Sequence, residues 1–252
     1  MTAATGQAWP YPRWIAHRGA GKLAPENTLV AFRLGASHGY RMFECDVKLS
    51  ADGVPFLLHD ATLDRTTNGQ GLAADLSWDG LSRLDAGSWH SPAFAGEPLA
   101  SLEAVAHFCL DNSLGLNIEI KPTPGSESLT GTVVANAAAR LWAGAPQGNL
   151  PLLSSFQPDA LEAARAAQAH LPRALLLDAL QSGWLETALR IGCVAVVCKH
   201  THWDAFSVQQ TQSAGLKVLS YTVNEASAAD RLWALGTDGI ITDRVDLFSP
   251  AS

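Results

Sequence analysis

Short apolar runs alternate along the chain with longer stretches in which apolar residues recur every three to four positions. The short runs predict β-strands, and the longer stretches predict α-helices. The predicted strands are Arg13–His17, Met42–Lys48, Val54–His59, Leu116–Ile120, Leu150–Phe156, Arg173–Leu177, Val194–Cys198, Lys217–Thr222 and Gly239–Thr242. The predicted helices are Leu29–His38, Leu102–Leu110, Leu129–Trp142, Pro158–Ala169, Leu185–Ile191, Ala205–Ala214 and Ala226–Leu235. Such alternation indicates parallel strands joined by right-handed helical crossovers.

The number of strands predicts a closed α/β barrel. Met42–Lys48 and Val54–His59 flank a turn that is too short for a crossover helix, so we expect them to pair as a hairpin. About eight barrel strands then remain, and 252 residues suit a single domain of the TIM-type (β/α)8 fold. A doubly wound open sheet is the alternative, but the turn His17–Gly21 lacks the glycine pattern GxGxxG.

Residues 61–100 interrupt the alternation. They are rich in Gly, Asp, Ser and Trp and show little regular period. We interpret them as a small insertion on the barrel and not as a second core. The whole chain, residues 1–252, is therefore expected to form one barrel domain that carries this insertion.

The overall charge narrows the range of partners. The formal net charge of −7 disfavours nucleic acid and anionic membranes as partners, because both would be repelled. A small anionic substrate stays possible where the site itself concentrates positive charge. The chain has no apolar run of 18 residues and no basic leader followed by an apolar segment, so we expect a cytoplasmic protein without stable membrane association. The sequence predicts no oligomeric state.

Four cysteines are spread widely along the chain, at Cys45, Cys109, Cys193 and Cys198. None of them forms a CxxC pair, so a structural zinc site is not expected. We expect reduced, buried thiols.

Acidic residues follow one face of two predicted strands near their carboxyl ends, where parallel barrels place their sites. Glu44 and Asp46 are two positions apart and project from the same face, and Glu119 repeats that geometry on a later strand. Three inward carboxylates would repel one another, and a hard divalent cation such as Mg²⁺ or Ca²⁺ would relieve the repulsion. Salt bridges with Arg18 and Lys121 are the alternative, but two cations do not balance three anions.

Two histidines end predicted strands beside these carboxylates. A histidine side chain ordinarily titrates near neutrality, so of His17 and His59 one can act as a base and the other as an acid. Arg18 offers a bidentate fork for a phosphate group, and Lys121 offers a compact positive charge. The other histidines considered, at positions 38, 90, 107 and 170, have no such neighbours and are interpreted as structural.

The order and spacing of these residues resemble the glycerophosphodiester phosphodiesterase family. The matching segments are His17–Gly19, Pro25–Thr28, Glu44–Val47, His59–Asp60, Leu84–Trp89, Glu119–Pro122, Ser154–Phe156, Thr222–Asn224 and Thr237–Asp243. The resemblance implies a TIM-type barrel with a small insertion domain between its second and third strand–helix units. It also implies hydrolysis of glycerophosphodiesters, small-molecule substrates, to sn-glycerol 3-phosphate and an alcohol.

The resemblance also implies roles for single residues: Glu44, Asp46 and Glu119 as metal ligands, His17 and His59 as the acid–base pair, and Arg18 and Lys121 as phosphate contacts. Tyr221 departs from the family, which usually has Trp before Thr-Val-Asn. It keeps an aromatic wall for the substrate but adds a hydroxyl group. Leu99–Leu102 replaces the family's Ile-Pro-Thr-Leu, and Ser101 can still cap the following helix.

Several roles stay open at this point. Glu26 can orient Arg18, while Asn27 or Thr28 can cap a helix, and Asp243 is either functional or a helix cap. Lys199 and His200 are more simply a solvated strand end than part of a pocket. The nucleophile is either water or a substrate hydroxyl.

Two other functions fit the sequence less well. A lysophospholipase D-like enzyme would need an exposed apolar or basic rim, which the sequence does not indicate. An inactive barrel that serves as a binding module should lack at least one of the two histidines and three carboxylates, and all five are present.

Overall fold

The computed structural model describes residues 9–146 and 149–250. Its strands are β1 (Trp14–Ala16), β2 (Met42–Leu49), β3 (Pro55–Leu57), β4 (Gly115–Ile120), β5 (Leu152–Ser155), β6 (Arg173–Leu177), β7 (Ala195–Lys199), β8 (Lys217–Tyr221) and β9 (Gly239–Thr242). The helices that alternate with them are α1 (Leu29–Ser37), α3 (Leu102–Asp111), α4 (Glu127–Leu141), α5 (Pro158–Ala167), α6 (Trp184–Ile191), α7 (Ala205–Ser213) and α8 (Ala226–Leu235). Every predicted strand and helix is present, and the ends differ by at most two residues.

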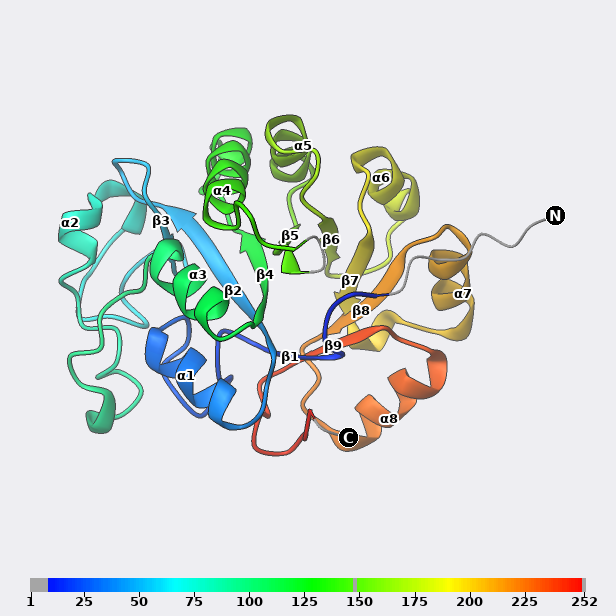
Figure 1. The fold of residues 1–252 in the computed structure, drawn as a ribbon, viewed down its shortest axis with the longest axis horizontal. Coiled ribbons are helices and arrows are strands. Elements are labelled where there is room, and N and C mark those ends of the chain that lie inside the picture. Colours follow the sequence, from blue (N-terminus) through cyan, green and yellow to red (C-terminus); the bar gives the residue numbers. More distant parts are fainter. Residues whose placement is uncertain (1–8, 147–148, 251–252) are drawn as a thin grey trace.

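Eight of the described strands close into a parallel barrel. The strands follow in the order β1, β2, β4, β5, β6, β7, β8 and β9, and β9 pairs back onto β1 with Trp14 beside Ile240. The helices surround this ring, as Figure 1 shows. The predicted (β/α)8 barrel is confirmed, and the open sheet is excluded because β9 pairs back onto β1, which also pairs with β2, so the ring of strands is closed.

The predicted hairpin is also confirmed. β3 pairs antiparallel with β2, with Leu57 beside Val47, and so does not enter the barrel ring. Gly53 in the connecting turn has φ 78°, a left-handed value that glycine adopts without steric cost.

The insertion leaves the barrel after β3 and returns at α3. It contains η1 (Ala73–Asp75), α2 (Trp78–Leu81) and η2 (Pro92–Phe94), at the left of Figure 1. The insertion therefore lies inside the second strand–helix unit and not between the second and third units. Its apolar side chains Leu63, Ala73, Leu81, Ala86 and Leu99 pack with Phe56 of β3 and Leu58 in a small cluster that is separate from the barrel core.

Side-chain alternation along the strands separates two apolar layers. The barrel interior holds Tyr11, Ile15, Met42, Leu152, Ala174, Leu176, Ala195, Val197, Leu219 and Ile241. The larger layer between strands and helices includes Cys45, Ile118 and Ile120, so Glu44, Asp46 and Glu119 project inward as predicted. All four cysteines are buried and free. None of the described helices has the length and apolar character to cross a membrane.

Candidate active site

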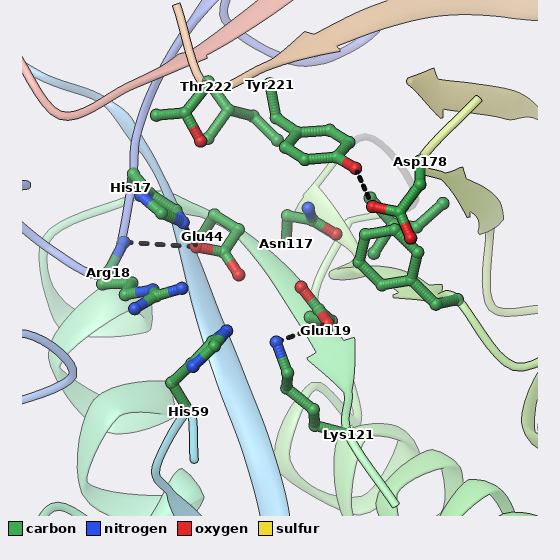
Figure 2. A pocket seen from close by; sticks show the side chains of 13 residues that line it. His17, Arg18, Glu44, His59, Asn117, Glu119, Lys121, Asp178, Tyr221 and Thr222 are labelled. Carbon is green, nitrogen blue, oxygen red and sulfur yellow. Dashed lines mark hydrogen bonds and ion pairs between the residues drawn. The ribbon is translucent and has the colours of Figure 1, made fainter. Parts of the chain in front are cut away.

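The predicted site residues meet at one end of the barrel, around a cavity of about 280 Å³ (Figure 2). The side chains that line it are His17, Arg18, Glu44, His59, Asn117, Glu119, Lys121, Phe156, Leu176, Asp178, Tyr221, Thr222 and Ile241. Asp46 is fully buried, does not line the cavity and forms ion pairs with the lining residues Arg18 and Lys121. Lys199 and His200 do not line this cavity.

The three predicted carboxylates form one cluster. One oxygen each from Glu44, Asp46 and Glu119 lies within 4.8 Å of the others, and all three residues are buried. Burial, with the charges of Asp46 and Glu119, raises the pKa of Glu44 well above its usual range. Burial and the charge of Asp46 raise the pKa of Glu119 to about 7. Neighbouring buried carboxylates repel one another when ionised, and a bound divalent cation would relieve that repulsion. Hard divalent cations prefer such oxygen ligands, so the cluster fits a cation site.

Two cations border the cluster. Lys121 Nζ lies 3.1 Å from both Asp46 Oδ1 and Glu119 Oε1. Arg18 Nε lies 3.1 Å from Asp46 Oδ2, within ion-pair distance although not in hydrogen-bond geometry. Burial opposes the charge of Asp46, but Arg18 and Lys121 outweigh it and hold the pKa of Asp46 below its usual range.

These ion pairs do not neutralise Glu44. Its Oε2 accepts a hydrogen bond of 3.2 Å from the backbone amide of Arg18, and Oε1 has no partner among the described residues. The His17 ring atom Nε2 lies 3.7 Å from Oε2. The salt-bridge alternative thus accounts for Asp46 and Glu119 but leaves Glu44 without a cationic partner. An unpaired charge buried in the protein is costly.

His17 is held by a carboxylate from the other end of the chain. Its Nδ1 lies 2.6 Å from Asp243 Oδ1, and Asn224 donates a hydrogen bond of 2.9 Å to Asp243 Oδ2. Burial opposes ionisation, but the hydrogen bond with His17 keeps the pKa of Asp243 at about 2. Gly21 allows this approach, since a Cβ there would lie 2.1 Å from the Asp243 carbonyl oxygen. Asp243 therefore binds the His17 ring and caps no described helix.

His59 has a matching arrangement. Its Nδ1 lies 2.7 Å from Asp60 Oδ1, and Arg65 binds the other oxygen of Asp60 at 2.6 Å. The hydrogen bond from Arg65 keeps the pKa of Asp60 well below its usual range. Burial lowers the pKa of His59 itself. Each imidazole thus has its Nδ1 bound to a carboxylate, which leaves its Nε2 for the cavity.

The segment before α1 positions Arg18. Glu26 accepts a hydrogen bond of 2.8 Å from Arg18 and two more from Arg65, so Glu26 does orient Arg18. Asn27 is not the cap, because its amide group binds the side chain and backbone of Asp46 at 2.8 and 3.1 Å. Thr28 caps the helix instead. The predicted cap of α3 by Ser101 is confirmed.

The opposite wall of the cavity is more apolar and contains Tyr221. The Tyr221 hydroxyl lies 3.0 Å from Asp178 Oδ1, and its ring packs edge-on against Phe156. The sequence reasoning missed Asp178, which follows β6, and Asn117, on β4. Asn117 could have been found, because it precedes Glu119 by two positions and must share its inward face.

This geometry defines the active site of a barrel enzyme that acts on an anionic substrate. A family model described as the glycerophosphoryl diester phosphodiesterase family matches residues 17–247. The chain therefore belongs to that family, and its activity is that of a glycerophosphodiester phosphodiesterase.

The similarity extends over nearly the whole chain. The chain is 35% identical to YhdW of Bacillus subtilis over 238 residues, which cover 92% of this chain and 94% of that protein. It is 33% identical to the glycerophosphodiester phosphodiesterase of Caldanaerobacter subterraneus subsp. tengcongensis, with 91% and 93% covered. The solved structure of an Oleispira antarctica phosphodiesterase in complex with the product sn-glycerol-3-phosphate has a TM-score of 0.88 and 33% identity, with 96% and 97% covered.

Proposed function

We propose that the protein hydrolyses glycerophosphodiesters to sn-glycerol 3-phosphate and an alcohol, with one divalent cation, Mg²⁺ or Ca²⁺, and two histidines. The observation that carries this proposal is the buried cluster of Glu44, Asp46 and Glu119, with one oxygen from each within 4.8 Å of the others. These three residues would hold the cation. When bound, it would act as a Lewis acid on a phosphoryl oxygen.

Arg18 and Lys121 would bind the phosphodiester. Both line the cavity, and both carry the positive charge that an anionic substrate needs in a protein with a net charge of −7. Burial lowers the pKa of Lys121, but Asp46 and Glu119 outweigh it, and the resulting pKa lies above its usual range. Lys121 is therefore a permanent charge and not a base. Fixed charges that point at the phosphate favour the charge that develops in the transition state.

His17 and His59 would transfer the protons. Figure 2 shows the two rings reaching the cavity from different elements, with Arg18 between them in this view. One imidazole would remove the proton of the attacking oxygen, and the other would protonate the leaving alkoxide. The attacking oxygen is water or the substrate's own glycerol hydroxyl.

The product is proposed from the similarity to the Oleispira antarctica phosphodiesterase, whose solved structure contains sn-glycerol-3-phosphate. The lining residues of this chain suit that molecule, with basic groups on one side of the cavity and aromatic and aliphatic groups on the other.

A chelation experiment tests the proposal. The protein is stripped of metal, and Mg²⁺ or Ca²⁺ is added back with glycerophosphocholine as substrate. Release of sn-glycerol 3-phosphate is followed with a coupled glycerol 3-phosphate dehydrogenase. We expect turnover only with added metal, and full turnover after chelation would contradict the metal requirement. Lysophosphatidylcholine in a parallel arm tests the lysophospholipase D alternative.

A further inference from the structure

Asn117 lies in the wall of the cavity with its polar atoms unpaired. It is on β4, two residues before Glu119, and is completely buried. Neither its Oδ1 nor its Nδ2 has a hydrogen-bond partner among the described residues. Buried side-chain amides are nearly always hydrogen-bonded, so an amide with both groups free at a cavity wall points to a ligand.

No described residue forms a side-chain hydrogen bond with Asn117. Its β-sheet neighbours in register are Glu44 on β2 and Leu152 on β5. The other lining residues on the far wall include Leu176 and Ile241, which have no polar side-chain atoms. Figure 2 shows Asn117 between the carboxylate cluster and the wall that carries Tyr221. The amide is therefore a buried polar group of that wall whose acceptor and donors are both left without a protein partner.

The depth of Asn117 indicates which part of the substrate reaches it. The phosphate belongs beside Arg18 and Lys121, so the two halves of the diester must extend in different directions. The alcohol differs in size between glycerophosphodiesters and needs an open side, whereas glycerol is small and constant. A carboxamide supplies one acceptor and two donor hydrogens in one group, which suits hydroxyl groups.

We propose that Asn117 binds the free hydroxyl groups of the glycerol half and so selects glycerophosphodiesters over diesters that lack them. This inference rests on the proposed function and gives Asn117 a substrate-binding role in addition to those of Arg18 and Lys121. A site that hydrogen-bonds a substrate hydroxyl discriminates strongly against the analogue without it, because its own polar groups are left unpaired. Asn117 acts on substrate binding and takes no proton.

The test compares glycerophosphocholine with an analogue in which only the terminal glycerol hydroxyl is replaced by hydrogen. The analogue keeps the 2-hydroxyl, so it remains competent whether water or that hydroxyl attacks. The metal-loaded wild type should prefer glycerophosphocholine by about 10- to 100-fold in kcat/KM. The variant Asn117→Leu has a similar shape without polar atoms and should prefer it by less than about threefold. A variant that keeps the wild-type preference overturns the proposal.

Three further measurements separate this role from the alternatives. Asn117→Leu should weaken competitive inhibition by sn-glycerol 3-phosphate about tenfold or more but leave inhibition by inorganic phosphate unchanged. It should be at least as resistant to heat as the wild type without ligand, because two unpaired buried groups are removed. A lower melting temperature would indicate a structural role and overturn the proposal.

Calorimetric titration with Mg²⁺ supplies the third measurement. Asn117→Leu should bind the ion as the wild type does, and a loss of affinity would make Oδ1 a metal ligand and overturn the proposal. Asn112→Leu, at the exposed end of α3, is the matched control. Wild-type activity that persists after chelation would refute the metal requirement alone, because the preference ratio is measured independently of it.

Discussion

Asp243 Oδ1 lies 2.6 Å from His17 Nδ1, although 226 residues separate the two in the chain. Closure of the barrel brings them together, because β9 pairs with β1 and Asp243 directly follows β9. The carboxylate fixes the direction of the ring and favours the tautomer with the proton on Nδ1. Nε2 is then left to face the cavity, where the proposed proton transfer requires it.

The first prediction concerns this contact. Asp243→Asn keeps the size of the side chain but loses the charge, so it should lower kcat by about 10- to 100-fold and change KM little. Asp246→Asn is the control, because Asp246 is exposed, pairs with Arg244 in the same loop and does not line the cavity. Steady-state kinetics with glycerophosphocholine measure the effect. Equal activity of Asp243→Asn and Asp246→Asn would show that the contact does not position His17.

The second prediction concerns the two imidazoles. His17→Ala and His59→Ala should each lower kcat by about 10²- to 10⁴-fold, the usual contribution of a positioned acid or base. The fold should survive, because both residues border a cavity and neither belongs to the apolar clusters. Circular dichroism and thermal unfolding check the fold. His107→Ala, on the exposed face of α3, should keep wild-type activity. Near-full activity of both site variants would end the acid–base proposal.

Much of the site followed from local rules. Spacing by two along a strand placed Glu44 and Asp46 on one face, and the strand–helix alternation predicted the barrel whose rim carries them. The same rule would have found Asn117 had it been applied to every polar residue of the strand. These parts depend on the pleat of the backbone, which short stretches of sequence determine.

The supporting contacts did not follow from the sequence, because they depend on barrel closure and loop conformation. Arg18 has φ 51° and Asn27 has φ 60°, left-handed values that are unusual outside glycine. That backbone brings Asn27 to Asp46 and leaves the helix cap to Thr28. The small apolar cluster of the insertion could not be predicted, because its apolar residues have no regular period.

The third prediction concerns pH and metal binding. Burial and Asp46 raise the pKa of Glu119 from 4.5 to about 7, so the metal-free site holds protons near neutrality. A cation must displace them, and its affinity should therefore rise as pH increases through about 7. Calorimetry in buffers of different ionisation enthalpy should detect proton release on Mg²⁺ binding. Affinity that is constant across this range would contradict the coupled cluster.

The fourth prediction concerns thermal stability and follows from the same raised pKa of Glu119. The folded, metal-free protein binds the Glu119 proton more tightly than the unfolded chain does, so that contribution is complete below pH 4.5 and is lost as pH rises through about 7. The melting temperature of the chelated protein should therefore fall across this range, and Mg²⁺ should restore it at the upper end. Glu119→Gln should reduce both the fall and the rescue. Equal pH dependence in this variant would assign the effect to other groups.

The last prediction concerns the alcohol half of the substrate. If glycerol binds at Asn117, the alcohol extends toward Asp178, which is exposed and has no described cation within ion-pair distance. Burial and Asp178 raise the pKa of Tyr221, so its hydroxyl stays a neutral donor to that carboxylate. Asp178→Asn should raise KM for glycerophosphocholine, whose alcohol is a cation, by about two- to fivefold, and less at high salt. KM for the neutral-alcohol substrate glycerophosphoglycerol should change little. Tyr221→Phe is the companion variant, because it keeps the aromatic wall and the carboxylate charge and removes the hydroxyl that bonds Asp178 and the Leu177 carbonyl oxygen. Equal changes for both substrates in Asp178→Asn would place the alcohol elsewhere in the cavity.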